Sequence, residues 1–174
     1  MPAAPFQPSA FVLPEDAHAK VHAIHGYWLD CAPAPGRLPG RRSIDPLRIP
    51  RLLENIWLLD VVPRPSDASS PDADMMAPRF RMRLVGGAMR RHGILTAPGD
   101  FIESFLPPDA LPLRELHLLA DTCCPAWYRG HAFMPHDREL HMLERIFLPM
   151  AEDGETVDVV LGLTVFFDEQ GREM

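Results

Sequence analysis

The chain has 174 residues, of which 47% are hydrophobic and 24% are charged, and its formal net charge at pH 7 is -7. These values are ordinary for a single globular domain with a sizeable apolar core. The negative charge disfavours nucleic acid and anionic membrane surfaces as partners, because both require a positive field.

Cysteine usage and the length of the apolar runs predict the compartment. The three cysteines, Cys31, Cys123 and Cys124, are too few for a disulfide framework, and no Cys/His spacing typical of a zinc site occurs. The N-terminal stretch has no basic leader, so no signal peptide is expected. No run reaches the ~18 apolar residues that a membrane span requires. We therefore expect a cytoplasmic protein without a membrane partner.

The chain is expected to consist of a flexible arm over residues 1–14, a single domain over 15–168 and a frayed tail over 169–174. The domain opens with an amphipathic helix at 15–32. Its apolar face is the expected dimer contact, and this predicts a homodimer. The residues of that face singled out for interaction are Val21, Ile24 and Trp28.

A second face of the same helix carries histidines at three- and four-residue spacing, His18, His22 and His25. This spacing can hold a metal ion. No acid or cysteine joins them, so the expected role is a solvated polar face, and no metal site is predicted.

Residues 36–60 are the most informative run of the chain. Asp45 followed by Pro46 is a typical helix start, which predicts a short helix over 46–54 with a kink at Pro50. The following IWLLDVV predicts a buried strand. Arginines gather in the same run and could hold an anion or a partner, with Arg41 and Arg42 as the candidate interaction residues.

The rest of the chain predicts an antiparallel sheet interrupted by short helices. RFRMRLVGG alternates strictly, with Phe80, Met82 and Leu84 on one face and arginines on the other, so it predicts a strand paired with IWLLDVV across a loop at 63–78. Short helices are expected near 88–92, 101–105 and 112–121. Three further strands are expected within 124–134, 139–150 and 157–167, the last two joined by a turn at Asp153-Gly154. The fold class is therefore α+β with five antiparallel strands.

This order of elements resembles that of PAS-type sensory domains. The resemblance is sharper to a family of bacterial single-domain PAS-like proteins. It rests on Tyr27-Trp28, GRLPGRRSIDP (36–46), RIPRLLENIWLLDVV (48–62), RFRMRLVGG (79–87) and LPMAEDGETVDVVLG (148–162). It implies a sheet in the order 2-1-5-4-3 with short helices over one face. Between them PAS domains hold a flavin, a haem or a small metabolite, or fill the space with side chains. The sequence identifies no cofactor.

The sequence favours a non-catalytic sensory or regulatory module that binds a small ligand in this cavity, a protein partner, or both. The expected cavity or core residues are Phe80, Met82, Leu84, Met89, Leu116, Leu119, Trp127, Ile146 and Phe147. The alternative is a ligand-free interaction or dimerisation module, because an open and a filled cavity give the same apolar pattern.

A small enzyme is the least favoured hypothesis. It would use Cys123 or Cys124 with His117, or Asp121 with His131. No nucleophile elbow, phosphate-binding glycine loop or useful pair of carboxylates occurs. His117 could also ligate a haem, but a lone histidine in a short helix is usually structural.

Overall fold

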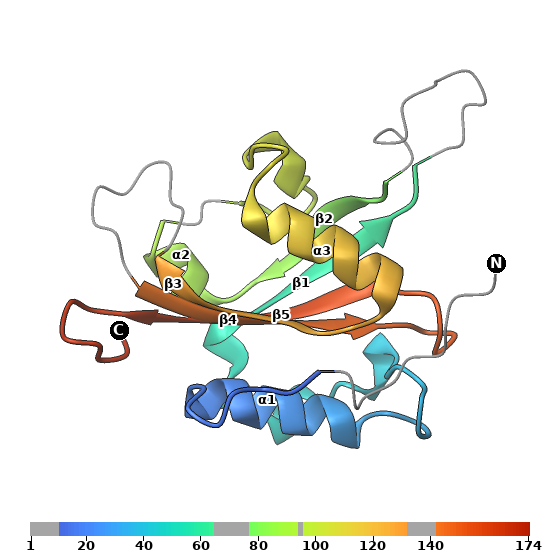
Figure 1. Cartoon of the computed structure of the whole chain (residues 1–174), viewed down its shortest axis with the longest axis horizontal. Coiled ribbons are helices and arrows are strands. Elements are labelled where there is room, and N and C mark those ends of the chain that lie inside the picture. The colour runs from blue at the N-terminus through green and yellow to red at the C-terminus, as the bar shows by residue number, and fades with distance from the viewer. Residues whose placement is uncertain (1–10, 65–76, 94–95, 132–141) are drawn as a thin grey trace.

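A computed structural model describes residues 11–64, 77–93, 96–131 and 142–174 (Figure 1). Parts of several predicted segments lie outside these residues, namely most of the arm at 1–14, most of the loop at 63–78, and the strand ends at 132–134 and 139–141. Five antiparallel strands form one sheet in the order β2-β1-β5-β4-β3, as predicted. The strands are β1 (Ile56–Val62), β2 (Arg79–Val85), β3 (Ala126–His131), β4 (Met142–Met150) and β5 (Val159–Phe167).

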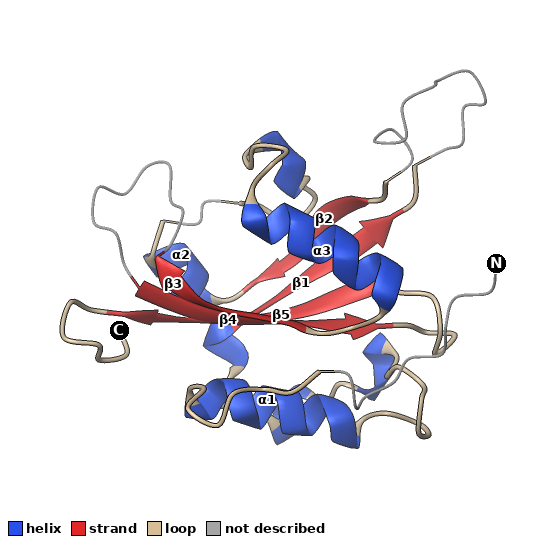
Figure 2. Cartoon of the chain, viewed as in Figure 1, coloured by secondary structure: helices blue, strands red, loops and turns tan. Residues whose placement is uncertain are grey.

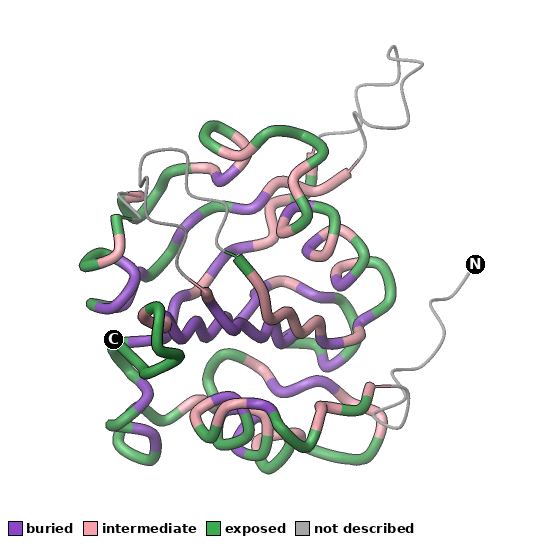
Figure 3. The backbone as a smooth tube through the Cα atoms, turned by 60° about the vertical axis from the view of Figure 1, so that its left-hand side comes forward, coloured by how far each residue is buried: buried purple, intermediate pink, exposed green. Residues whose placement is uncertain are grey.

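Helices cover both faces of this sheet. The helices α2 (Gly87–Arg91) and α3 (Leu111–Thr122) lie over one face, which we call the inner face, and the 3-10 turn η6 (Ile102–Ser104) packs beside β2 (Figures 1 and 2). The helix α1 (Ala19–Asp30) lies under the opposite face, which we call the α1 face, against β4 and β5. Because both faces are covered, β4 and β5 are buried along almost their whole length (Figure 3).

A bulge in the β1–β2 pair corrects one prediction. Leu58 pairs with Leu84 while the next residue, Leu59, pairs with Met82, so Arg83 is an extra residue in β2. An extra residue shifts the alternation of side chains by one position. Phe80 and Met82 therefore point to the inner face, whereas Leu84 lies on the α1 face and is 43% exposed. Leu84 is not a cavity residue.

The short helix predicted over 46–54 is two 3-10 turns, η3 (Pro46–Arg48) and η4 (Leu53–Asn55). Asp45 caps the first turn as predicted, since its Oδ1 accepts a hydrogen bond from the Leu47 amide at 2.9 Å. Pro50 lies between the two turns. Its ring has no N–H and disfavours helical angles at the residue before it, so the helix breaks rather than kinks.

The remaining helices occur where they are expected. The first helix begins later than predicted, at Ala19, where the His18 Nδ1 accepts a hydrogen bond from the Lys20 amide at 3.2 Å. The helix α2, the turn η6 and the helix α3 fall within the three predicted short-helix segments or one residue beyond them.

The C-terminal tail folds back onto the sheet instead of fraying. The Met174 amide donates a hydrogen bond to the Phe166 carbonyl at 3.0 Å, and Glu173 forms a β-bridge with Phe167. The Glu173 carboxylate also pairs with Lys20 of α1. The tail therefore links the end of β5 to the first helix.

Removing the indole of Trp57, which is 5% exposed in the middle of the inner face, tests this core. We expect Trp57→Ala to lower the free energy of unfolding by about 3–5 kcal/mol, because it leaves a cavity that the sheet cannot close. Leu47→Ala is the control, since Leu47 is 87% exposed and should change stability by less than about 0.5 kcal/mol. Urea denaturation followed by circular dichroism measures both. A loss below about 1 kcal/mol for Trp57→Ala would contradict this packing.

Candidate functional site

The first candidate site is the space between the inner face and the helices that cover it. Six of the predicted cavity residues meet here and are buried in one apolar core: Phe80, Met82, Met89, Leu116, Leu119 and Phe147. They come from β2, α2, α3 and β4, so segments that are far apart in the sequence contribute to this part of the core.

The centre of this space is occupied by Trp57 of β1. Its indole packs edge-on against the Phe147 ring, with centroids 5.1 Å apart, and its Nε1 donates a hydrogen bond to the Thr164 Oγ1 at 3.0 Å. Gly162, the partner of Trp57 on β5, makes room for the ring, because a Cβ there would overlap the indole. The sequence predicts Trp57 as a core residue but does not reveal its pairing with Gly162.

The burial of these residues shows that side chains fill the space. A cavity large enough for a flavin or a haem would leave accessible surface on the residues that line it. Trp57, Met82 and Met89 are instead only 5%, 4% and 6% exposed. Across the described residues the inner face is therefore a packed core, which is the filled version of the predicted cavity.

Two of the predicted cavity residues, Trp127 and Ile146, lie on the other face of the sheet. They pair with one another across β3 and β4, next to the fully buried Glu144. The Glu144 carboxylate accepts hydrogen bonds from the Trp127 Nε1 at 2.9 Å, from the Arg129 Nε at 2.8 Å and from the His18 amide at 2.8 Å. A buried carboxylate is stable when donors surround it in this way. This cluster holds the start of α1 against the sheet.

The three apolar residues predicted as the helix interaction surface are inside the chain's own core. Val21 and Ile24 are fully buried, and the Trp28 Nε1 donates a hydrogen bond to the Pro149 carbonyl at 2.8 Å. The amphipathic pattern is therefore explained by packing of α1 on β4 and β5, and these side chains are not available to a partner. Arg41 and Arg42 are exposed as expected, and the Arg42 Nε lies 3.1 Å from the Glu152 Oε1.

Two of the sequence motifs behind the resemblance pack against each other. The loop at 36–46 meets the turn between β4 and β5, where the Leu38 amide donates to the Gly154 carbonyl at 3.0 Å. The Ala151 amide donates to the Pro39 carbonyl at 3.0 Å, and Arg37 pairs with Glu155. These contacts give Arg37 a structural role in joining the two motifs.

In the described part of the chain, the His117 ring and the Cys123 thiol each lie against a backbone carbonyl. The described residues contain no group of three or more His, Cys, Asp or Glu side chains that could hold a metal ion. The ring of His117 lies 3.2 Å from the Pro78 carbonyl. The Cys123 thiol donates a hydrogen bond to the Glu155 carbonyl at 3.4 Å, and burial raises its pKa, with the neighbouring Cys124 and Asp153 adding to the effect. A raised pKa leaves less nucleophilic thiolate at neutral pH.

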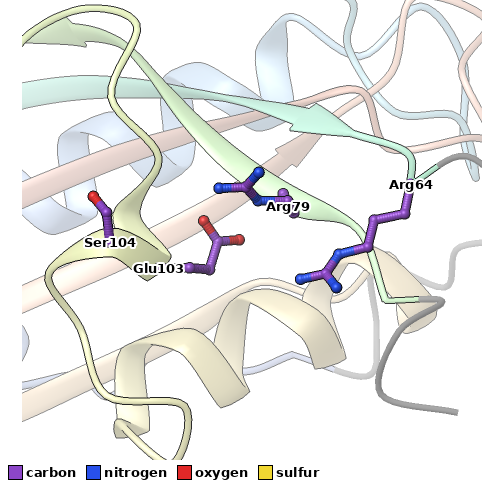
Figure 4. Close-up of a pocket in the computed structure, with 4 residues that line it drawn as sticks. All are labelled: Arg64, Arg79, Glu103 and Ser104. Carbon is purple, nitrogen blue, oxygen red and sulfur yellow. The ribbon is translucent and has the colours of Figure 1, made fainter. Parts of the chain in front are cut away.

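The second candidate site is a surface pocket of about 410 Å³ lined by Arg64, Arg79, Glu103 and Ser104 (Figure 4). A further surface hollow of about 400 Å³ lies beside the C-terminal end of α1 and the loop that follows it. Arg79 belongs to the predicted arginine stripe. Arg64 and Glu103 were missed, because they are far apart in the sequence, in segments without periodic patterning.

Comparison with known proteins does not assign the chain to a family. No protein-family model matches the chain, and no curated protein matches it. Within the described residues, none of the helices has the length and apolar character needed to cross a bilayer.

The burial of Cys123 predicts how the cysteines react with iodoacetamide. Two variants are compared, both with Cys31→Ser. The one that also carries Cys124→Ser keeps only Cys123, and it should be alkylated more slowly at pH 7.5 than the one that carries Cys123→Ser and keeps only Cys124. The reason is that Cys123 is buried with a raised pKa, whereas Cys124 is half-buried. Mass spectrometry of timed samples measures both rates. Faster reaction of Cys123 would indicate an activated thiolate and would support the enzyme hypothesis.

Proposed function

We propose that this chain is a non-catalytic regulatory module of the PAS type, whose output passes through contact with a protein partner and not through a ligand in its core. The observation that carries the proposal is the filled inner face, where Trp57 occupies the space in which PAS domains hold a cofactor. The strand order β2-β1-β5-β4-β3, with short helices on one face, supports the PAS assignment.

The part of the sheet that best suits a partner is the β1–β2 end of the α1 face. The helix α1 packs on β4 and β5, and at β2 the side chains of Arg81, Arg83 and Leu84 are exposed. Both arginines pair with the Asp60 carboxylate, which holds them in fixed positions around the exposed leucine. A preorganised apolar residue with a charged rim is typical of a protein contact.

Catalysis is disfavoured by the state of the groups that would perform it. Burial raises the pKa of the Cys123 thiol, and its hydrogen bond goes to a backbone carbonyl. His117 likewise lies against a carbonyl oxygen. A cysteine nucleophile needs a lowered pKa and a base within hydrogen-bonding reach, and these contacts supply neither.

Native mass spectrometry of the purified protein, with an absorption spectrum from about 300 to 600 nm, tests the proposal. We expect the mass of the bare chain or of a simple multiple of it, and no absorption band from a flavin or a haem. The same sample sprayed under denaturing conditions is the control for covalent additions. Extra mass that denaturation releases, together with a cofactor spectrum, would show that the core holds a ligand and would overturn the proposal.

A further inference from the structure

The two edge strands of the sheet, β2 and β3, differ in their hydrogen bonding. At the β2 edge, the loop that follows α2 takes up the outward backbone groups. The Met82 amide donates to the Asp100 carbonyl at 2.7 Å, and the Met82 carbonyl accepts from the Gly99 amide at 2.7 Å. The Phe80 amide donates to the Glu103 Oε1 at 2.8 Å. The β2 edge is therefore closed to a further strand.

The register shows which backbone groups of β3 point away from the sheet. The Val61 amide donates to the Asp158 carbonyl at 2.9 Å, so these residues form a hydrogen-bonded pair, and such pairs alternate along an antiparallel ladder. Followed through β5 and β4, this alternation directs the even-numbered residues of β3 to β4 and the odd-numbered residues outward. The outward backbone groups are therefore those of Trp127, Arg129 and His131.

The outer side of β3 is open. Among the residues that the structure describes, no strand pairs with β3 on this side, and no hydrogen bond outside the β3–β4 ladder involves the amide or carbonyl of Trp127 or Arg129. Charge also leaves the edge accessible, because the Arg129 guanidinium pairs with the Glu144 carboxylate at 2.8 Å and with the Asp16 carboxylate at 2.7 Å. An edge without cover or free charge is a template for another strand.

A second copy of this chain fits the open edge through its own β3. Because the β2 edge is covered, a copy can extend the sheet only with β3, and two identical edges meet about a two-fold axis, which makes the strands antiparallel. In the register centred on Tyr128, each Arg129 lies opposite Trp127 of the other copy. Guanidinium and indole attract one another, as these two residues do within one chain at 5.5 Å. Centring on Arg129 would instead place two arginines opposite one another.

We propose that β3 is a homodimerisation edge, at which two copies join their sheets with Tyr128 at the two-fold axis. Trp127 of each copy then exchanges both backbone hydrogen bonds with Arg129 of the other. This contact replaces the helix contact expected from the sequence, whose apolar residues are buried in the core. It lies at the opposite edge of the sheet from the partner surface at β1 and β2, so the inference goes beyond the proposed function and does not depend on it.

Amide hydrogen exchange of the unmodified chain, with sedimentation velocity from about 5 to 500 µM, tests the edge. We expect a dimer within this range. Wherever the chain is dimeric, the Trp127 and Arg129 amides should exchange at least about tenfold more slowly than in a free peptide, because only the second copy offers them an acceptor. The Tyr128 amide is the internal control. It points to β4, so it should be protected in the monomer and the dimer alike.

Disulfide trapping tests the register, in a background with the chain's own cysteines replaced by serine. In the proposed register Tyr128 faces itself in a non-hydrogen-bonded pair, whose Cα atoms lie about 4.5 Å apart, within reach of a disulfide. Tyr128→Cys should therefore form a covalent dimer at least about tenfold faster than Ala126→Cys. Ala126 is the matched control, because it lies on the same face of β3 but opposite Gly130 of the second copy. Mass spectrometry without reductant measures both.

Three results would overturn the inference. A chain that stays monomeric at about 500 µM would contradict self-association and leave the edge to a strand of another protein. A dimer whose Trp127 and Arg129 amides exchange as fast as in a free peptide would use a different surface. Equal trapping of the two cysteine variants would contradict the register. If those variants fail to fold, hydrogen exchange of the unmodified chain decides alone.

Discussion

The packing of the Trp57 indole against Gly162 is the interaction on which the rest of the structure depends. The ring comes from β1, lies against the backbone of β5, touches Phe147 of β4 and donates its N–H to Thr164. It therefore ties the three central strands together and fills the space beneath the covering helices. Since a ligand cannot share this space with the indole, the regulatory role that we propose would require contacts at the surface of the protein.

The opposite face of the sheet is fixed by buried polar contacts as well as by apolar packing. Glu144 receives three donors, and one of them is the His18 amide at the start of α1. At the other end of the helix, the Tyr27 hydroxyl accepts a hydrogen bond from the Asp45 amide at 2.6 Å. Removing the donors of Glu144 would leave a fully buried carboxylate unpaired, which is costly. The helix α1 is therefore held against the sheet as part of the domain.

Much of the fold could be predicted from the sequence, because alternation and turn residues are local signals. Asp45-Pro46 and Asp153-Gly154 mark a helix start and a hairpin turn, and both occur as predicted. The face on which Trp127 lies was not predictable, since β4 is buried on both faces and carries a charged residue on each, so only the register distinguishes them. The bulge at Arg83 does not interrupt the alternation of apolar and charged residues in the sequence, so the exposure of Leu84 could not be predicted either. The pocket around Glu103 depends on tertiary contacts that no local pattern records.

The most direct test of the filled core is whether removing the Trp57 ring creates a binding site that the unmodified chain lacks. Apolar cavities made by truncating a buried side chain can bind a small molecule of the lost shape. Indole should therefore raise the Tm of Trp57→Ala in a concentration-dependent way and leave the Tm of the unmodified chain unchanged. If indole stabilised the unmodified chain to the same extent, the core would already contain an open cavity, which would contradict a core filled by Trp57.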